Sequence, residues 1–405
     1  MVTLGSWRNR SLTISCKPNC LTISIQQDAG AVVFSYDLAG RLWTAMRAGI
    51  SYRRGLDGKI VAKWTVGPQN RERRWLSTSE ARELEEQARQ TAEDVLAAIA
   101  SGEAVLQTGL DAEGQQMFAA AARFSASAYA ADVAGYHQVY KTVGILPPDQ
   151  YMAVVLQATE GCSFNTCTFC NFYRDRPFRI KPADVFRQHV RAVWSFLGAG
   201  QSLRRTIFLG DANALVVPMP RLMPLLDIIR EELDVEKLGG IYAFLDGFSG
   251  ERKTQADYAL LRERGLKRVY IGMESGSAPL LQFLKKPGKP EDVIGAVNTM
   301  KSAGIAVGLI VLLGAGGHAY AQGHVRDTIQ AINSMQLDLD DIVYFSELVE
   351  SEGLDYTRDA HQANLQPLTA AERLLQAETI ENALVFSQNG GVPHISRYDI
   401  REFVY

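Results

Sequence analysis

The chain has 405 residues, of which 47% are hydrophobic and 21% are charged. These proportions exclude a wholly disordered protein and suggest roughly two or three globular domains. The net charge of −3 argues against a protein whose whole surface binds nucleic acid. No apolar run approaches the roughly 18 residues of a membrane-spanning helix, and residues 1–10 lack the apolar core of a signal peptide. We therefore expect a cytoplasmic protein without a membrane span.

Residues 1–75 are expected to form a small β-rich region, an antiparallel meander or barrel. Short runs rich in β-branched and aromatic residues alternate there with turn signals. The five predicted strands are 21–25, 31–36, 41–45, 50–53 and 60–64. Residues 76–148 are expected to be helical, because Ser77 and Glu80 have the spacing of a capping box. This pattern predicts one helix from there to near Gly102 and a second over 112–133.

Residues 149–350 alternate between apolar strands and helices, which predicts an α/β fold with a parallel sheet, curved or barrel-like. The six predicted strands are 152–157, 206–209, 240–244, 268–272, 306–313 and 341–346. Polar or glycine-rich loops follow the first five, and we expect them to meet at one rim, where such folds place their chemistry. Residues 351–405 are predicted to be a C-terminal extension with a helix over about 369–387 that closes the open side of the barrel.

The loop after the first barrel strand carries three of the five cysteines. Cys162, Cys167 and Cys170 form a C-x4-C-x2-C motif. Three thiolates on one loop can bind three irons of a cubane cluster and leave the fourth iron open. A zinc site would need a fourth ligand, and His189, the nearest histidine downstream, lies on a predicted helix. Plain packing of buried thiols is the other alternative.

Residues 161–179 resemble the cluster loop of the radical S-adenosylmethionine (SAM) superfamily. They are most similar to its elongator and coproporphyrinogen-III-oxidase-like branch, in which an Asn-Phe-Tyr-Arg-Asp stretch follows the C-x4-C-x2-C variant. The resemblance covers roughly residues 150–350. It implies a partial (βα)6 TIM-like barrel, a 4Fe-4S cluster bound by the three cysteines, and bound SAM.

The resemblance also implies which residues contact SAM. Phe169 would lie near the adenine, and Gly210 and Asp211 would lie in the loop that faces the methionine amino group. Glu274 and Ser275 would bind the ribose, and Gly314 and Gly316 would lie on the adenine side. All of them except Ser275 have a structural alternative, namely core packing for Phe169, loop ordering for Asp211, helix capping for Glu274 and simple turns for the glycines.

The implied function is that of a radical SAM enzyme. Its cluster would cleave SAM reductively to a 5′-deoxyadenosyl radical, which abstracts hydrogen from an organic substrate of unknown identity. Its partners would be that small molecule and a low-potential electron donor of the flavodoxin or ferredoxin type. Methyl transfer, which would use a second SAM, is a possible outcome within this class. A different class is a non-enzymatic haem carrier of the same branch, with His318, His324 or His394 as axial ligand.

Three further features leave alternatives open. Residues 1–74 hold 12 Lys and Arg against 4 Asp and Glu, and four tryptophans lie in or next to this segment, which would suit an RNA-modifying enzyme. Cys16 and Cys20 could hold a second cluster or simply pack in the β-rich region. Residues 314–319 satisfy the G-x-G-x-x-A dinucleotide fingerprint, which a nicotinamide or flavin enzyme would use.

Overall fold

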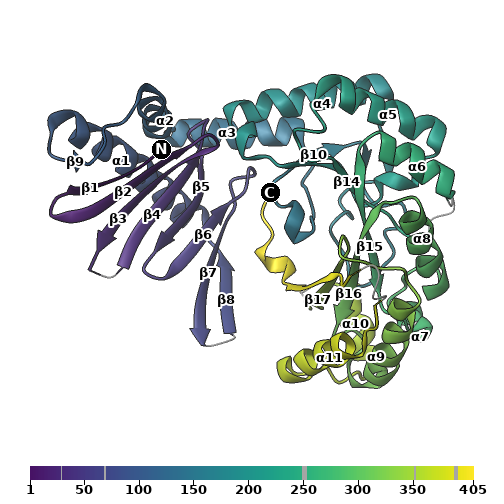
Figure 1. Cartoon of the computed structure of the whole chain (residues 1–405). Coiled ribbons are helices and arrows are strands. Elements are labelled where there is room, and N and C mark those ends of the chain that lie inside the picture. The colour runs from purple at the N-terminus through teal and green to yellow at the C-terminus, as the bar shows by residue number, and fades with distance from the viewer. Residues whose placement is uncertain (29, 68–69, 249–252, 351–352, 387–390) are drawn as a thin grey trace. The chain divides into compact units, whose positions relative to one another are not determined.

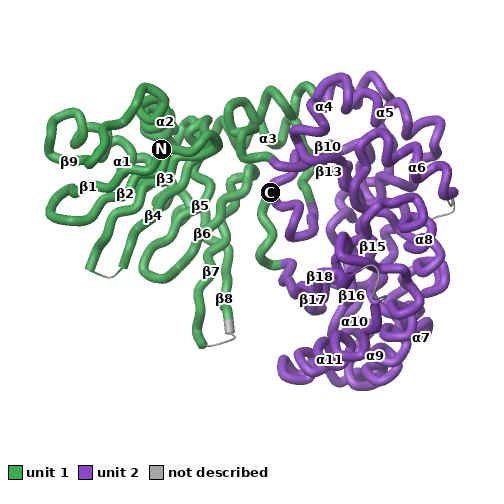
Figure 2. Tube along the Cα trace, viewed as in Figure 1, with its two compact units in different colours: residues 1–143, 191–204, 401–405 green, residues 144–190, 205–400 purple. Residues whose placement is uncertain are grey.

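The computed structural model describes residues 1–28, 30–67, 70–248, 253–350, 353–386 and 391–405. The chain divides into two compact units (Figure 2). Unit 1 comprises residues 1–143, 191–204 and 401–405, and unit 2 comprises residues 144–190 and 205–400.

Unit 1 is built on a nine-stranded antiparallel sheet, in which β1 to β8 form a meander and β9 is added beside β1 (Figure 1). The five predicted strands correspond to β3 to β7, whereas β1, β2, β8 and β9 are additional. The strands are β1 (Val2–Trp7), β2 (Arg10–Lys17), β3 (Cys20–Gln27), β4 (Gly30–Asp37), β5 (Leu42–Arg47), β6 (Ile50–Arg54), β7 (Ile60–Gly67), β8 (Asn70–Trp75) and β9 (Val105–Leu106).

Strand β8 escapes sequence-based prediction because Asn-Arg-Glu-Arg-Arg-Trp is typical of a solvated loop. It lies at one edge of the sheet and pairs with β7 in antiparallel register. Charged side chains are a common feature of edge strands, because they discourage pairing with other chains.

Three helices of unit 1 follow the meander, namely α1 (Thr78–Ser101), α2 (Ala112–Arg123) and α3 (Ala126–Val139). The predicted capping box of α1 is present, since Ser77 N donates to Glu80 Oε2 at 2.8 Å and Glu80 N donates to Ser77 Oγ at 3.3 Å. The single helix predicted over 112–133 is wrong. The chain leaves the helical path at Phe124, and the Ser125 hydroxyl caps a new helix by accepting a bond from Ala128 N.

Unit 2 contains a seven-stranded parallel sheet in the order β10-β13-β14-β15-β16-β17-β18. The six predicted strands are confirmed, and the sequence missed the seventh, which the C-terminal extension adds beside β17. The strands are β10 (Ala153–Gln157), β13 (Thr206–Gly210), β14 (Ile241–Phe244), β15 (Leu266–Glu274), β16 (Ala306–Leu313), β17 (Ile342–Glu347) and β18 (His394–Tyr398). A short pair, β11 (Thr159–Glu160) with β12 (Arg179–Ile180), flanks the cysteine loop.

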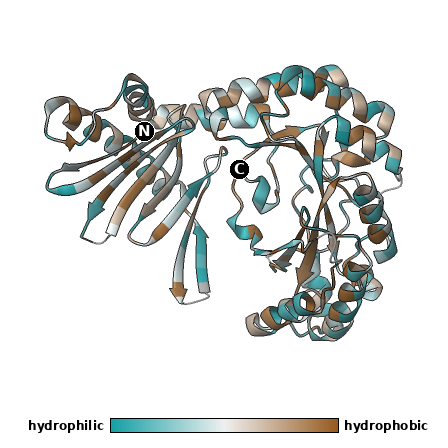
Figure 3. Ribbon diagram, viewed as in Figure 1, coloured by the Kyte–Doolittle hydropathy of each residue, from teal (hydrophilic) through white to brown (hydrophobic). Residues whose placement is uncertain are grey.

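Helices follow the outer side of this curved sheet (Figure 1). The sheet is largely apolar, and the helices mix apolar and polar residues (Figure 3), as expected when a parallel sheet is covered and its helices face water on one side. The helices are α4 (Ala183–Leu197), α5 (Met219–Glu232), α6 (Gln255–Glu263), α7 (Ala278–Phe283), α8 (Pro290–Ser302), α9 (Gly317–Asn333), α10 (Asp355–Gln362) and α11 (Ala370–Ala383). The second half of α4, from residue 191, belongs to unit 1. Across the described residues, no helix combines the length and the apolar character that crossing a membrane requires.

Candidate functional site

A pocket of about 210 Å³ lies at the carboxyl-terminal ends of the strands in unit 2. As predicted, the segments that follow β10, β13, β14 and β15 reach it, because the carboxyl ends of parallel strands share one edge of the sheet. The glycine loop 314–317 also follows the carboxyl end of its strand, β16, but none of its residues lines the pocket. Strands β14 to β18 contribute Phe244, Glu274, Leu312, Ser346 and Tyr398.

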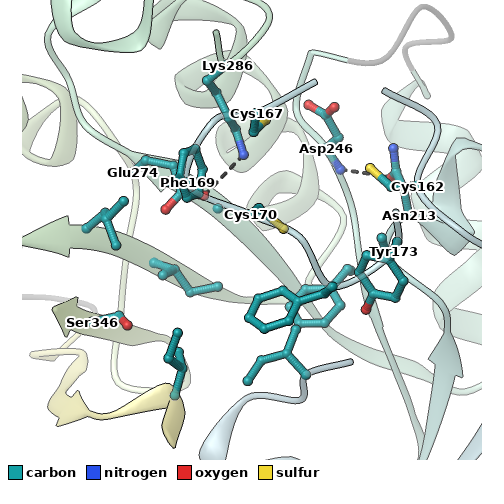
Figure 4. A pocket seen from close by; sticks show the side chains of 18 of the residues that line it. Cys162, Cys167, Phe169, Cys170, Tyr173, Asn213, Asp246, Glu274, Lys286 and Ser346 are labelled. Carbon is teal, nitrogen blue, oxygen red and sulfur yellow. Dashed lines mark hydrogen bonds and ion pairs between the residues drawn. The ribbon is translucent and has the colours of Figure 1, made fainter. Parts of the chain in front are cut away.

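The cysteine loop, residues 161–170, forms one wall of this pocket. Its three thiols, at Cys162, Cys167 and Cys170, are half-buried and line the same cavity (Figure 4). Local bonds hold the loop in place. Thr168 N and Thr168 Oγ1 both donate to the Leu284 carbonyl, at 3.0 Å and 3.3 Å. The loop is thus anchored to the segment after α7, and all three cysteines reach the cavity.

The donor set fits an iron–sulfur cluster. Burial raises the pKa of the Cys167 thiol to about 12 and that of Cys170 to about 11, so that a bound metal would have to displace their protons. Within the described ranges, no three His, Cys, Asp or Glu side chains gather tightly enough to hold one metal ion. A cubane does not require such convergence, because each thiolate binds a different iron. His189, the zinc alternative, accepts a bond from Gln157 N at 2.9 Å with its Nε2.

Glu274 and Lys286 form an ion pair in the wall that faces the cysteines (Figure 4). Lys286 Nζ lies 3.1 Å from Glu274 Oε1, and the two side chains are only 13% and 9% exposed. Burial by itself lowers the pKa of Lys286, but the negative charge of Glu274, together with Cys167 and Asp246, raises it above its ordinary value. The pocket therefore contains a charged ammonium beside a carboxylate, both able to contact a polar ligand.

Phe169 lines the pocket and also belongs to the packing of unit 2. Its ring lies against a buried apolar cluster that includes Leu280, Leu284, Leu312 and Tyr356. The structure thus gives Phe169 both of its expected environments, a core contact on one side and the cavity on the other. Its position is fixed by packing rather than by hydrogen bonds.

The side chain of Asp211 holds the cysteine loop in place and does not line the pocket. Its side chain is 2% exposed and accepts bonds from Gln157 Nε2 at 2.8 Å, Gly161 N at 3.0 Å and Arg176 Nε at 3.1 Å. Burial raises the pKa of this carboxyl, while Arg176 counteracts that shift. Neither Asp211 nor the preceding Gly210 lines the cavity. The loop-ordering alternative for Asp211 therefore matches its contacts.

Ser275, Gly314 and Gly316 also lie outside the pocket lining. Gly314 N donates to Gln376 Oε1 at 2.8 Å, and Gly316 N donates to the Tyr356 hydroxyl at 2.9 Å. The N-terminus of α9, where a dinucleotide phosphate would bind, is closed by the chain itself. A Cβ atom on Gly317 would lie 2.1 Å from the Gln366 carbonyl oxygen. The G-x-G-x-x-A match of residues 314–319 therefore serves packing.

Several polar or aromatic residues line the pocket although sequence reasoning did not assign them to the site. Asn213 links two loops, because its Nδ2 donates to Ser163 Oγ at 3.0 Å and its Oδ1 accepts from Asp246 N at 2.9 Å (Figure 4). The sequence could have indicated Asn213 and Asp246, since both follow predicted strands. No comparable signal marks three others, which lie after α7 or on late strands. These five are Asn213, Asp246, Lys286, Ser346 and Tyr398.

The three histidines expected as axial ligands of a haem carrier do not line the pocket. His318 is exposed beside Glu372, at 3.5 Å, and His394 is exposed on β18. His324 is wholly buried on α9, and burial lowers its pKa to about 4. These positions give no support to haem binding at this cavity.

The basic N-terminal segment is less open than an RNA platform requires. Trp7 is buried in the core of unit 1, and Trp64 packs against that core. Trp43 is half-buried, so that only Trp75 of the four, at 44% exposed, presents a large part of its ring to solvent. Aromatic side chains that stack on bases need free ring faces.

Cys16 and Cys20 point to opposite faces of the sheet in unit 1. Cys16 pairs with Leu21 on the buried face, whereas Cys20 pairs with Lys17 on the other. Residues directly opposite on paired strands share a face, so the neighbouring pairs Cys16–Leu21 and Lys17–Cys20 lie on different sides. The two thiols cannot bind one cluster in this arrangement.

The double variant Cys16→Ala/Cys20→Ser is accordingly expected to bind as much iron as the wild type after anaerobic reconstitution. Iron and sulfide are measured chemically, together with the visible absorption of the cluster. Loss of a fraction of the iron in this variant would show that a second metal site exists in unit 1.

Comparisons with known proteins agree with this geometry. Residues 156–330 match the family model described as the radical SAM superfamily. An uncharacterized methyltransferase of Pyrococcus horikoshii is 28% identical over 201 residues, which cover 48% of this chain and 40% of that protein. This chain thus spans well under two thirds of the length of that curated relative.

Two solved structures give further similarities. Coproporphyrinogen III oxidase (HemN) from Escherichia coli has a TM-score of 0.42 at 14% identity and covers 55% of this chain and 50% of that one. Elp3 from the archaeon Methanocaldococcus infernus has a TM-score of 0.37 at 13% identity and covers 60% of each chain.

The family match contains the cysteine loop and the strands β13 to β16 that build most of the pocket. Radical SAM proteins use a 4Fe-4S cluster and SAM, and three thiols with a polar, partly aromatic wall provide suitable groups for both. Residues 156–330, which include the cysteine loop, thus match the radical SAM superfamily.

Proposed function

We propose that this protein is a radical SAM enzyme that acts on a small organic molecule in the pocket of unit 2. The observation that carries the proposal is the meeting of Cys162, Cys167 and Cys170 with the Glu274–Lys286 pair in one cavity. When bound, the cluster would supply the electron that cleaves SAM to methionine and a 5′-deoxyadenosyl radical. The electron is proposed to come from a flavodoxin or ferredoxin in the cytoplasm.

The residues of the chain would bind, orient and shield the reactants. The three thiolates would hold the cluster at the wall of the pocket. Glu274 would accept hydrogen bonds from the ribose hydroxyls, and Lys286 would balance its charge when water is excluded. Phe169 would offer an apolar face to the adenine, supported from behind by its packing. Asp211, Gly210, Ser275, Gly314 and Gly316 would maintain the loops instead of contacting SAM.

The far side of the pocket is apolar, which would limit access of water to a reactive radical. It is formed by the segment before β10, by the segment after the cysteine loop, and by residues that follow β17 and β18. The apolar lining residues there include Leu146, Pro147, Phe172, Leu348, Val349 and Ile400.

The test is SAM cleavage by the whole protein. It is purified without oxygen, reconstituted with iron and sulfide, and incubated with SAM and dithionite. We expect 5′-deoxyadenosine in the chromatogram, and none without dithionite or after the iron is chelated. A reconstituted cluster that never yields 5′-deoxyadenosine or another SAM-derived product would contradict the proposal.

Methyl transfer is a second candidate, suggested by the printed name of the Pyrococcus relative. The same chromatogram distinguishes it, because transfer of a methyl group from SAM leaves S-adenosylhomocysteine. Formation of S-adenosylhomocysteine in proportion to turnover would favour this outcome.

A further inference from the structure

A buried hydrogen-bond network lies directly behind Glu274, outside the pocket. It joins the end of β15 to α9. Ser275 and His324 are both wholly buried, and Ser275 Oγ lies 2.7 Å from His324 Nδ1. Ser275 Oγ also accepts a bond from Ser277 N at 2.9 Å. The Ser275 side chain thus bonds to α9, although Glu274, the residue before it, lines the pocket.

One turn further along α9, Thr328 makes a second attachment to the same turn. Gly276 N donates to Thr328 Oγ1 at 2.9 Å, and Thr328 Oγ1 lies 3.4 Å from His324 Nδ1. The four-residue spacing places His324 and Thr328 on one face of the helix. Gly276 rests directly on this face, because a Cβ atom there would lie 2.2 Å from the Asp327 carbonyl oxygen. The two positions after Glu274, Ser275 and Gly276, are therefore fixed against α9.

Glu274 needs such support because its backbone is in an unfavourable conformation. Its φ of +62° lies in the left-handed region, which is uncommon for a residue other than glycine. The register between β15 and β16 shifts between Gly272 and Glu274. A residue in this conformation persists where its surroundings determine it. The result is a carboxylate turned into the pocket, 3.1 Å from Lys286 Nζ.

We propose that His324 is a positioning residue. Through Ser275 it holds the turn at Glu274, and thereby the carboxylate assigned above to the ribose of SAM. The inference rests on the proposed function for its ligand, but its contacts are independent of that assignment.

Packing alone does not account for a histidine at this position. Burial keeps the ring neutral, with its pKa lowered to about 4. Among the described residues, His324 Nε2 is buried without a hydrogen-bond partner. A buried polar atom without a partner is unfavourable, and leucine would fill similar space without that cost. The bond from Nδ1 to Ser275 is the feature that leucine could not reproduce.

The test compares SAM binding to the anaerobically reconstituted wild type and His324→Leu by equilibrium dialysis. We expect about tenfold weaker binding in the variant, with unchanged iron content, because the carboxylate is no longer held in place. In His324→Asn the Oδ1 atom can replace Nδ1, and part of the affinity should return. In a Glu274→Gln background, His324→Leu should cause little further loss, since its effect passes through Glu274.

A matched control separates positioning from general stability. Ile332 is also wholly buried on α9 but takes no part in the network. Ile332→Ala should lower the thermal midpoint while leaving SAM affinity unchanged. If wild type binds the cluster but no SAM, the proposed function fails, and with it the ligand of this inference. If the wild type binds SAM and the His324→Leu variant binds it equally well, the positioning role alone is overturned. The same follows if His324→Leu weakens SAM binding as much in the Glu274→Gln background as in the wild type.

Discussion

Cys167→Ala is expected to reduce the iron of the reconstituted protein from about four atoms per chain to a small fraction of that, and to abolish 5′-deoxyadenosine formation. Three cysteine ligands are the minimum that leaves one iron of a cubane open to SAM, so removal of one leaves two irons without a protein ligand. Iron, sulfide and the visible spectrum report the cluster, and chromatography reports the product. Cys162→Ala and Cys170→Ala should behave alike.

The effect should come from ligation rather than from unfolding. Cys167 is only half-buried, and its substitution by alanine removes one atom from a pocket wall. The thermal midpoint of the iron-free variant should therefore lie close to that of the iron-free wild type. The Cys16→Ala/Cys20→Ser variant is the matched control, because it also removes thiols but should retain the iron. Full iron and full SAM cleavage in Cys167→Ala would exclude the assigned ligand set.

The strands of the barrel could be predicted because their sequence pattern depends on burial. Residues of β10 are buried throughout, and β16 is a nearly continuous apolar run, as in other covered parallel sheets. The seventh strand, His394–Tyr398, gives no such signal. Its residues are only partly buried or exposed, and polar and basic residues interrupt its apolar ones. A polar strand at the edge of a sheet acquires its conformation from its neighbour, β17, which local sequence does not specify.

The candidate site likewise combines residues that local sequence predicts with residues that only the fold brings together. The cysteine spacing identified one wall, since the motif is local and the chemistry needs those residues close together in the chain. Lys286 lies 12 residues after Glu274, and only the fold brings its ammonium to the carboxylate. The orientation of Asp211 was equally inaccessible, because it depends on Gln157, Gly161 and Arg176, which come from different segments. Side-chain direction at a loop is decided by such long-range partners.

Asp211→Ala is expected to destabilise unit 2 by about 3–5 kcal/mol, the range observed when one partner of a buried ion pair is removed. Arg176, with its side chain 6% exposed, would lose its buried carboxylate partner at 3.1 Å while keeping the more exposed Asp175 at 3.0 Å, and Gly161 N would lose its acceptor next to Cys162. Urea unfolding of the iron-free protein should show a lower midpoint, and the reconstituted variant should lose iron faster to a chelator. Asp211→Asn, which keeps an acceptor oxygen, should fall between the variant and wild type.

An exposed ion pair supplies the control. Arg326 contacts Asp327 at 2.7 Å on α9, but its side chain is 73% exposed. Solvent screens such a pair, so Arg326→Ala should change stability by no more than about 1 kcal/mol and leave iron retention unchanged. Equal midpoints for Asp211→Ala and Arg326→Ala would mean that the buried pair contributes no more than a surface contact. A stable Asp211→Ala protein that binds iron normally but has lost SAM affinity would instead return Asp211 to the ligand-binding role that its contacts in this structure argue against.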